Sequence, residues 1–363
     1  MNNIEKIGRI EIIFLVVTVI FNNLILNIPS IIISLTGTGS WINVIYITIL
    51  AILFILLICK FFKPFIGMDI LDVSEYLGGK TFKIIFSLLY VVLFVTVSAI
   101  SIRLFANSLR LIYFDSTPLI ILMLLFLIPV AITAKLGLKA VSGTNLIIIT
   151  ISIATFFVYY FAASDFFVLQ RLFPALGYGS QVTFINGITN IFAFNIVGYL
   201  YFLKPFLKEE KDFKKLSILA IIICGFFLLL SIFALIMSFS FITHINETLS
   251  VFIVTRLISF GNFFQRVDAL INFVWIIVIL SFLSYNVYII SYLIKKTFSL
   301  KSHLELSFPI TALIFSVALV FKDIATVKNV TETFAKFYCI ILVFIVSFIV
   351  LLLAYFKKIK KGT

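Results

Sequence analysis

The stretch Ile10–Ser34 reads IEIIFLVVTVIFNNLILNIPSIIIS and decides the fold class. A helix that crosses the hydrocarbon core of a bilayer needs about 20 predominantly apolar residues, and this run is long enough. Its one charged residue, Glu11, stands at its start. The run has no small-residue cleavage site, so it is predicted to be a first membrane span and not a signal peptide.

The whole chain shares this apolar character. Of its 363 residues, 63% are hydrophobic and 12% charged, against about 45–50% and about 25% in soluble domains. Too few polar residues remain to cover a soluble surface, which argues against a soluble enzyme, a nucleic-acid-binding module and a disordered chain. The net charge of +13 is assigned to loops that face the cytoplasm and anionic membrane lipid, and not to nucleic acid. An integral, all-α polytopic membrane protein is predicted.

The apolar runs predict ten transmembrane helices. They cover Ile10–Ser34, Trp41–Phe61, Phe82–Ile112, Pro118–Thr133, Val141–Ala163, Thr183–Leu203, Leu216–Ile242, Val267–Ile294, Leu306–Phe321 and Phe334–Phe356. A further apolar stretch, Leu249–Phe264, is interrupted by Arg256 and is predicted to be an outer-surface or re-entrant helix.

The positive charges orient these spans. If the N-terminus lies inside, the inner segments hold 20 of the 28 Lys and Arg residues. Lys336, at the start of the last span, is counted among the eight on the outer side. An excess of Lys and Arg in alternate loops marks the cytoplasmic side, so both termini are expected to be cytoplasmic. No acidic residue falls near the middle of a span, which argues against proton coupling through a buried carboxylate.

Helix-weakening residues interrupt the first and the sixth span. The first contains Asn22, Asn23, Asn27 and Pro29, and the sixth contains Asn186-Gly187, Asn190, Asn195 and Gly198. Asparagine, glycine and proline are poor formers of a helix interior. The two spans are five apart and enter from opposite sides. This arrangement predicts a five-plus-five inverted repeat, over about 10–163 and 183–356, within a single permease-like domain of residues 1–363.

Broken helices in corresponding positions point to a substrate site. Their free backbone amides suit a carboxylate and their carbonyls an ammonium group, so the expected ligand is a small zwitterion such as an amino acid. Serines on neighbouring spans are weaker candidates. The candidate substrate-binding residues are Asn22, Asn23, Asn27, Ser98, Ser101, Asn190, Phe194, Asn195 and Ser284. The alternative is that the asparagines only join helices, without a ligand. No catalytic constellation or metal-ligand spacing occurs, so no enzyme, metal or cofactor is expected.

Three groups of residues carry a family resemblance. The first is LNIPS at Leu26–Ser30 with GTGSW at Gly37–Trp41, and the second is LFPALG at Leu172–Gly177. The third is ISFGNFFQRVDAL at Ile258–Leu270, followed by Trp275. Together they resemble the endospore germination permease family. The landmarks within these groups are Pro29, Trp41, Pro174, Arg266, Asp268 and Trp275.

The resemblance implies the fold of the amino acid–polyamine–organocation superfamily and the role of the B subunit of a spore germinant receptor. Such a subunit would bind a nutrient germinant, typically an amino acid, in the superfamily's central site. It would act with an A-like subunit and a lipoprotein C-like subunit in the inner spore membrane. Two alternatives stay open: an amino-acid permease of the cell membrane that carries out secondary transport, and a structural subunit that binds no ligand.

Overall fold

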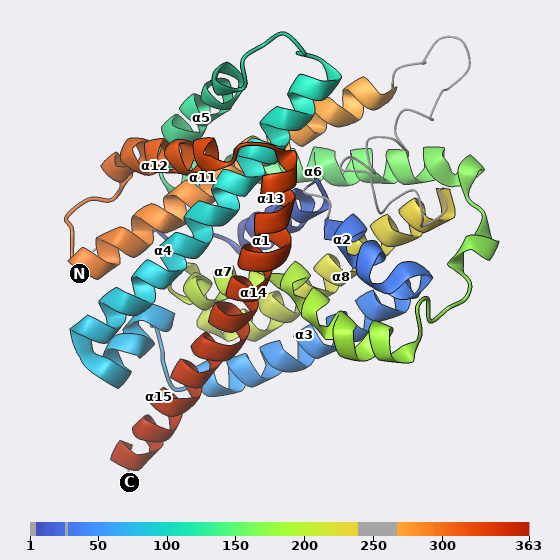
Figure 1. Ribbon diagram of the computed structural model, residues 1–363. Coiled ribbons are helices and arrows are strands. Elements are labelled where there is room, and N and C mark those ends of the chain that lie inside the picture. Colours follow the sequence, from blue (N-terminus) through green and yellow to red (C-terminus); the bar gives the residue numbers. More distant parts are fainter. Residues whose placement is uncertain (1–4, 26–27, 239–266, 363) are drawn as a thin grey trace.

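The computed structural model describes residues 5–25, 28–238 and 267–362 (Figure 1). Within these ranges every regular element is a helix, and a single backbone bridge joins Ile7 to Leu207. Asn27, Arg266 and the predicted outer helix Leu249–Phe264 lie outside the described residues.

The N-terminal half follows the predicted order of apolar runs. Its α-helices are α1 (Arg9–Ile25), α2 (Ile28–Thr36), α3 (Ser40–Phe62), α4 (Ile70–Ile112), α5 (Leu119–Lys135) and α6 (Leu138–Ala162). Short 3₁₀ turns are η1 (Gly37–Gly39), η2 (Ala163–Phe166) and η3 (Leu169–Leu172).

The C-terminal half is less regular. It begins with a π segment η4 (Gln181–Ile185) and a 3₁₀ segment η5 (Asn186–Phe194) before α7 (Ile196–Leu203). The next elements are η6 (Lys204–Phe206), η7 (Glu210–Asp212), α8 (Phe213–Ser238), α11 (Val267–Phe298), η8 (Leu304–Leu306) and α12 (Ser307–Val320). The last helical run comprises α13 (Ile324–Val330), π segment η9 (Thr331–Ala335), α14 (Lys336–Cys339), π segment η10 (Ile340–Val346) and α15 (Ser347–Gly362).

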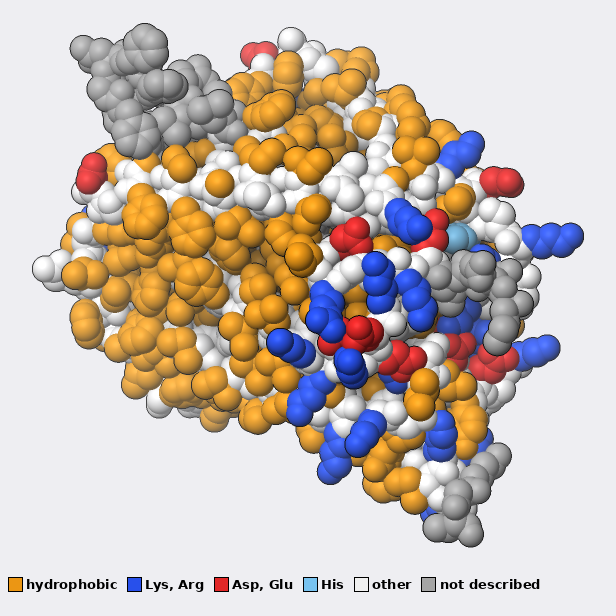
Figure 2. Space-filling view, turned by 180° about the vertical axis from the view of Figure 1, so that it is seen from behind, with side chains coloured by type: hydrophobic (Ala, Val, Ile, Leu, Met, Phe, Trp, Pro, Cys, Tyr) orange, Lys and Arg blue, Asp and Glu red, His pale blue; other side chains and the backbone are white. Residues whose placement is uncertain are grey.

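Six helical stretches of the described residues are long and apolar enough to cross a membrane, and a seventh forms if Gln181–Phe194 and Ile196–Phe206 count as one bent span. Two shorter apolar helices, Leu119–Lys135 and Leu304–Val320, accompany them. Apolar side chains cover a broad part of the surface, whereas Lys, Arg, Asp and Glu gather towards one side (Figure 2). The protein is therefore an all-helical integral membrane protein.

Two helices begin well before the apolar runs that were predicted for them. Asp69 and Asp72 form a capping box that starts α4 at Ile70, and the helix is interrupted at Gly79, where φ is 76°. Asp323 accepts a hydrogen bond from the Thr326 amide and starts α13 at Ile324. Both early segments contain polar residues. Capping, which hydropathy does not register, sets their starts.

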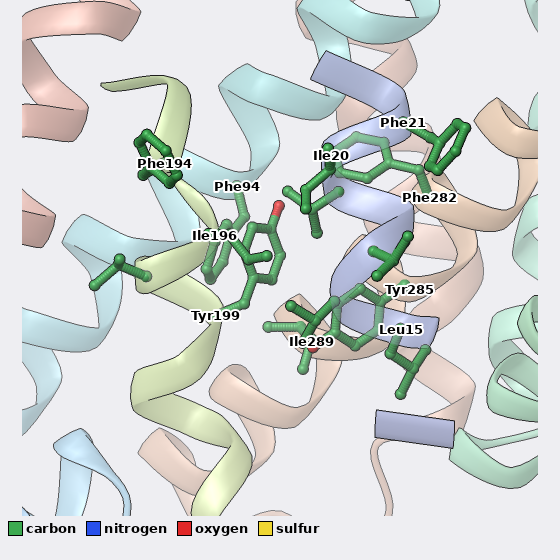
Figure 3. Packing of buried hydrophobic residues seen from close by; sticks show 14 of the residues in the cluster. Leu15, Ile20, Phe21, Phe94, Phe194, Ile196, Tyr199, Phe282, Tyr285 and Ile289 are labelled. Carbon is green, nitrogen blue, oxygen red and sulfur yellow. The ribbon is translucent and has the colours of Figure 1, made fainter. Parts of the chain in front are cut away.

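Helix α1 lies at the centre of the bundle. It packs against α6, α8 and α11, while α3 packs against α8, and α4 packs against α11 and α12. Figure 3 shows Leu15, Ile20 and Phe21 of α1 in the same buried cluster as Phe282 and Tyr285 of α11. Because α1 is enclosed by other helices, its polar residues Asn22 and Asn23 face protein and not lipid, with exposures of 0% and 4%.

Basic side chains close several helix ends. The Lys204 ammonium donates to the carbonyl oxygens of Phe62 and Phe65, where α3 ends. Arg103 donates to the Lys322 carbonyl at 3.0 Å, just beyond α12. The last carbonyls of a helix have no partner within the helix, so these cations fix the ends of α3 and α12 and with them the frame around α1.

Candidate ligand-binding site

The end of α1 meets the bend in the sixth predicted span. Helical segments Gln181–Phe194 and Ile196–Phe206 are inclined by 45° to each other, and Asn195 stands at the bend. The Asn23 amide donates to the Asn195 side-chain oxygen at 3.0 Å and to the Ala193 carbonyl at 3.1 Å. The Asn195 amide returns a hydrogen bond to Asn23 Oδ1 at 3.4 Å. Two of the predicted binding residues are therefore in direct contact.

A side chain of α3 binds backbone carbonyls of the helical segment before this bend. The Asn43 amide donates to the carbonyls of Thr183 (2.7 Å) and Gly187 (3.1 Å), two groups in the π and 3₁₀ region. Asn43 can approach because residue 187 is glycine: a Cβ there would lie 2.3 Å from Asn43 Nδ2. The non-α geometry leaves carbonyls without their usual partners, and Asn43 supplies a replacement.

A pocket lies beside this junction. Its volume, including the solvent-filled space at its opening, is about 580 Å³. Its wall combines the ends of α1 and α2, one face of α4, the bend of the sixth span and the π segment of the last helical run. The lining residues are Asn23, Ile28, Leu93, Phe94, Val97, Ile100, Phe192, Asn195, Tyr199, Thr331, Ala335, Lys336 and Cys339. The pocket is mainly apolar, with a few polar groups, as is usual for a small-molecule site.

Lys336 is buried within the protein, which the sequence analysis did not predict. It was counted with the outer positive charges, but the structure buries it in α14 with 8% of its surface exposed. Because the helical run begins at Ile324, Lys336 lies twelve residues, or about 18 Å at 1.5 Å per residue, from its start. Hydropathy did not predict this part of the helix because it contains the polar residues Thr326, Lys328 and Glu332.

A layer of polar side chains lies behind the pocket wall. The Tyr199 hydroxyl donates to Asn286 Oδ1 at 2.6 Å, and the Asn286 amide donates to Ser98 Oγ at 3.0 Å. The Phe94 and Tyr199 rings lie 4.7 Å apart between centroids (Figure 3). This chain of contacts joins α7, α11 and α4, so the position of Tyr199 in the pocket depends on both neighbouring helices.

Asn22 and Ser101 form a second contact between α1 and α4. The Asn22 amide donates to Ser101 Oγ at 3.3 Å, and its oxygen Oδ1 is buried without a hydrogen-bond partner. Neither residue lines the pocket.

The remaining predicted binding residues are Asn190, Phe194 and Ser284, and none of them is part of the pocket lining. Asn190 is fully buried; its amide donates to Asn43 Oδ1 at 2.9 Å. Phe194 is fully buried and does not line the pocket, whereas Phe192 does. Ser284 donates to the Leu280 carbonyl of its own helix, away from the pocket lining. The structure thus places Asn23 and Asn195 in the wall of one pocket. Asn190 contacts the lining residue Lys336 but, like Phe194 and Ser284, is not itself part of the lining.

None of the landmark residues that the structure describes lines this pocket. Pro29 is buried in α2, and the Pro174 carbonyl accepts a hydrogen bond from the Thr38 hydroxyl at 2.6 Å. The Trp41 and Phe233 rings lie 6.1 Å apart. Asp268 lies in α11, of which only the backbone is described at that point.

Trp275 lines a separate aromatic pocket of about 550 Å³ between α1, α6, α8 and α11, together with Phe21, Phe156 and Tyr159. Neither pocket offers a metal site: the described part of the chain holds no cluster of three or more His, Cys, Asp or Glu residues suited to a metal ion.

Comparison with known proteins places this architecture. A family model described as "Spore germination protein" matches residues 6–327. Among solved structures, the chain is similar to a Na⁺-coupled sialic acid symporter in its substrate-bound outward-open state. That similarity has a TM-score of 0.60 at 16% identity and covers 91% of this chain and 77% of the symporter. At this identity it describes the fold alone. No curated protein matches the sequence.

Proposed function

The chain belongs to the spore germination protein family, and on this premise we propose that it is the membrane subunit of a spore germinant receptor. It would bind a small nutrient germinant, in the first instance an amino acid, in the pocket beside Asn23 and Asn195. The observation that carries the proposal is the direct contact of these two amides at the wall of a pocket. The family match over residues 6–327, combined with such a pocket, favours a ligand-binding subunit over a purely structural one.

The proposal includes the finer architecture. Ten transmembrane helices would form two inverted repeats, over about 10–163 and 183–356, with both termini in the cytoplasm. Supporting this count, helices occupy the described part of each of the ten predicted runs, from α1 to the run that ends in α15. The membrane would be the inner spore membrane, and an A-like subunit and a lipoprotein C-like subunit would be the partners.

Binding would act by shifting a conformational equilibrium. A ligand favours the state that it binds more tightly, and only by its difference in affinity between the two states. The bend at Asn195 and the contact with Asn23 join two helical segments through side chains. A ligand that contacts both would change their relative stability, and the partner subunits would respond to that change.

The test uses spores that lack the gene and are complemented with variants. Asn195→Leu fills the bend with an apolar side chain and should abolish dipicolinate release in response to the nutrient while the protein still reaches the membrane. Asn186→Leu, at an exposed position of the same segment, is the matched control and should respond normally. A full response of the Asn195→Leu spores would disprove the placement of the site.

Transport is the second candidate, because the fold is shared with a symporter. Uptake of a labelled amino acid into proteoliposomes distinguishes the two functions. A subunit that triggers germination without net uptake is a receptor, whereas loss of uptake with normal germination in the deletion strain would indicate a permease.

A further inference from the structure

Lys336 places a formal positive charge in the wall of the pocket. It directly follows the π segment η9 in the last helical run and lies beside Asn190 and Phe192 of the sixth predicted span. Wide turns of this type change the direction of the following side chains and often occur at functional sites. The other residues that line the pocket carry no formal charge, so this wall has a charge of +1 while the lysine is protonated.

The contacts of Lys336 do not neutralise it. Its ammonium lies 3.5 Å from Asn190 Oδ1 and 5.2 Å from the centre of the Phe192 ring. Within the described part of the chain, no carboxylate forms an ion pair with it, and Glu332, four residues earlier, is the acid whose charge acts on it. A neutral amide and a ring face compensate a cation only in part.

An unpaired charge inside a membrane protein is costly. Buried ions are normally paired, and a cation placed among transmembrane helices generally marks a substrate or ion path. Lys204 and Lys296 follow the general rule, since each has an acidic partner within 4 Å. Among the residues that the structure describes, Lys336 is thus a buried cation that lines a pocket and has no anionic partner.

We propose that Lys336 receives the carboxylate of the ligand, and that the ligand is a small carboxylate with a compact apolar body. This inference rests on the proposed function, because it names the chemistry of the same pocket. Leu93, Phe94 and Val97 of α4 supply an apolar wall for the body. For an amino acid, the side-chain oxygens of Asn23 and Asn195 can accept from the ammonium group, since each amide oxygen has a second lone pair. Cationic ligands are excluded by repulsion.

The proposal can be distinguished from a site in which only the free backbone amides at helix ends bind the carboxylate of the ligand. If free backbone amides held the acid group, replacing Lys336 would change affinity little. A charge-assisted hydrogen bond contributes enough that its loss lowers affinity about 10- to 100-fold. The lysine should therefore decide which nutrients are bound.

The experiment measures thermal stabilisation of the full-length protein in lipid nanodiscs. The probes are the twenty L-amino acids, each neutral one matched with its amide, together with 4-methylpentanoate and isoamylamine. We expect one or more amino acids with apolar side chains to stabilise the protein, and their amides and the amine to fail. Lys336→Gln should weaken binding of the acid about 10- to 100-fold, Lys336→Arg should retain most of it, and the exposed-site control Lys328→Gln should bind as the wild type does.

Three results would overturn the proposal: an amide or amine that binds as tightly as its acid, an acid that binds Lys336→Gln unchanged, or no binding by any acid. Folding of the variant is checked by its ligand-free melting temperature, which should not fall because no carboxylate among the described residues pairs with the charge that is removed.

Germination is then compared between spores that carry Asn195→Leu alone and spores that carry Lys336→Gln alone. This comparison separates the inference from the proposed function. Loss in the first with a normal response in the second leaves the receptor site standing and the role of Lys336 disproved. A normal response in both disproves the site itself.

Discussion

Two lysines within the helical bundle have opposite surroundings. Lys296, near the end of α11, lies 2.6 Å from Asp69 and 2.5 Å from Asp72 at the start of α4. Lys336, in the last helical run, has an amide oxygen at 3.5 Å and a ring face as partners. Lys296 holds two helices together and needs no ligand. Lys336 is buried at a cost in folding free energy that an anion would offset.

The difference shows how a single fold separates stability from recognition. Where α4 and α11 meet, the Asp69 carboxylate also accepts from the Tyr292 hydroxyl at 2.7 Å and from the backbone amides of Leu71 and Asp72. Its hydrogen-bonding capacity is filled. In the pocket, by contrast, the polar groups of Asn23, Asn195 and Lys336 line a cavity. A filled network fixes a structure, and an incomplete one is suited to binding.

Breaking the filled network should have the largest effect on stability. Asp69→Ala removes a fully buried carboxylate and leaves Lys296 and Tyr292 without it. Removing one partner of a buried ion pair costs about 3–5 kcal/mol. We expect a marked drop in the midpoint of thermal unfolding in nanodiscs. Glu75→Gln, which breaks the more exposed pair with Lys83, is the control and should cost less than about 1 kcal/mol.

Removing the unpaired lysine should have the opposite sign. Lys336→Met keeps a flexible side chain of similar length and eliminates a buried cation for which the described residues provide no carboxylate partner. Because the desolvation of an unsatisfied polar group costs about 1–3 kcal/mol, we expect the ligand-free protein to unfold at an equal or higher temperature. The same variant should lose the nutrient response. A melting temperature several degrees lower would mean that Lys336 supports the fold, and the contrast between the two lysines would be lost.

The resemblance to the germination permease family is confirmed by the match over residues 6–327, and the apolar runs predicted the all-helical membrane fold. Hydropathy did not predict Ile70–Gly78 or Ile324–Val330, because these helical segments are partly polar and begin at the capping residues Asp69 and Asp323. The ten-span count and the inverted repeat remain predictions.

In the site, the asparagines of spans one and six were identified from the sequence, and the structure places Asn23 against Asn195. Lys336 was missed because its depth depends on where the last helix begins. A lysine thirteen residues after an N-capping Asp323, in a run that continues into an apolar helix, was the available signal. The Asn43 contacts depend on tertiary packing between α3 and the sixth predicted span, which no local pattern reveals.

A smaller change tests how the surroundings of Lys336 are positioned. Gly187→Ala places a Cβ 2.3 Å from Asn43 Nδ2 and forces Asn43 away from Asn190. Overpacking of this kind costs about 1–3 kcal/mol, and it should also weaken ligand binding through Asn190 and Lys336. Gly143→Ala in α6 is the matched control, because its Cβ would meet nothing within 4 Å. Equal melting temperatures for the two variants would show that Asn43 moves freely.

The smallest expected effect concerns the segment that follows α11, outside the spans. Burial, with a further contribution from the positive charge of Lys295, lowers the pKa of His303 to about 4, against about 6.5 in an unfolded chain. Its ring packs edge-on against Tyr288, and Glu5 is the acid that opposes the shift.

Since the unfolded state binds the proton first, the contribution of His303 to stability is complete above about pH 6.5 and declines as the pH falls towards 4. The melting temperature of the wild type should therefore decrease more between pH 7 and pH 4.5 than that of His303→Gln. The two pH profiles would be parallel if His303 were fully solvated, and the burial of this base beside Lys295 would then be incorrect. The effect should stay local and leave ligand binding at Lys336 unchanged.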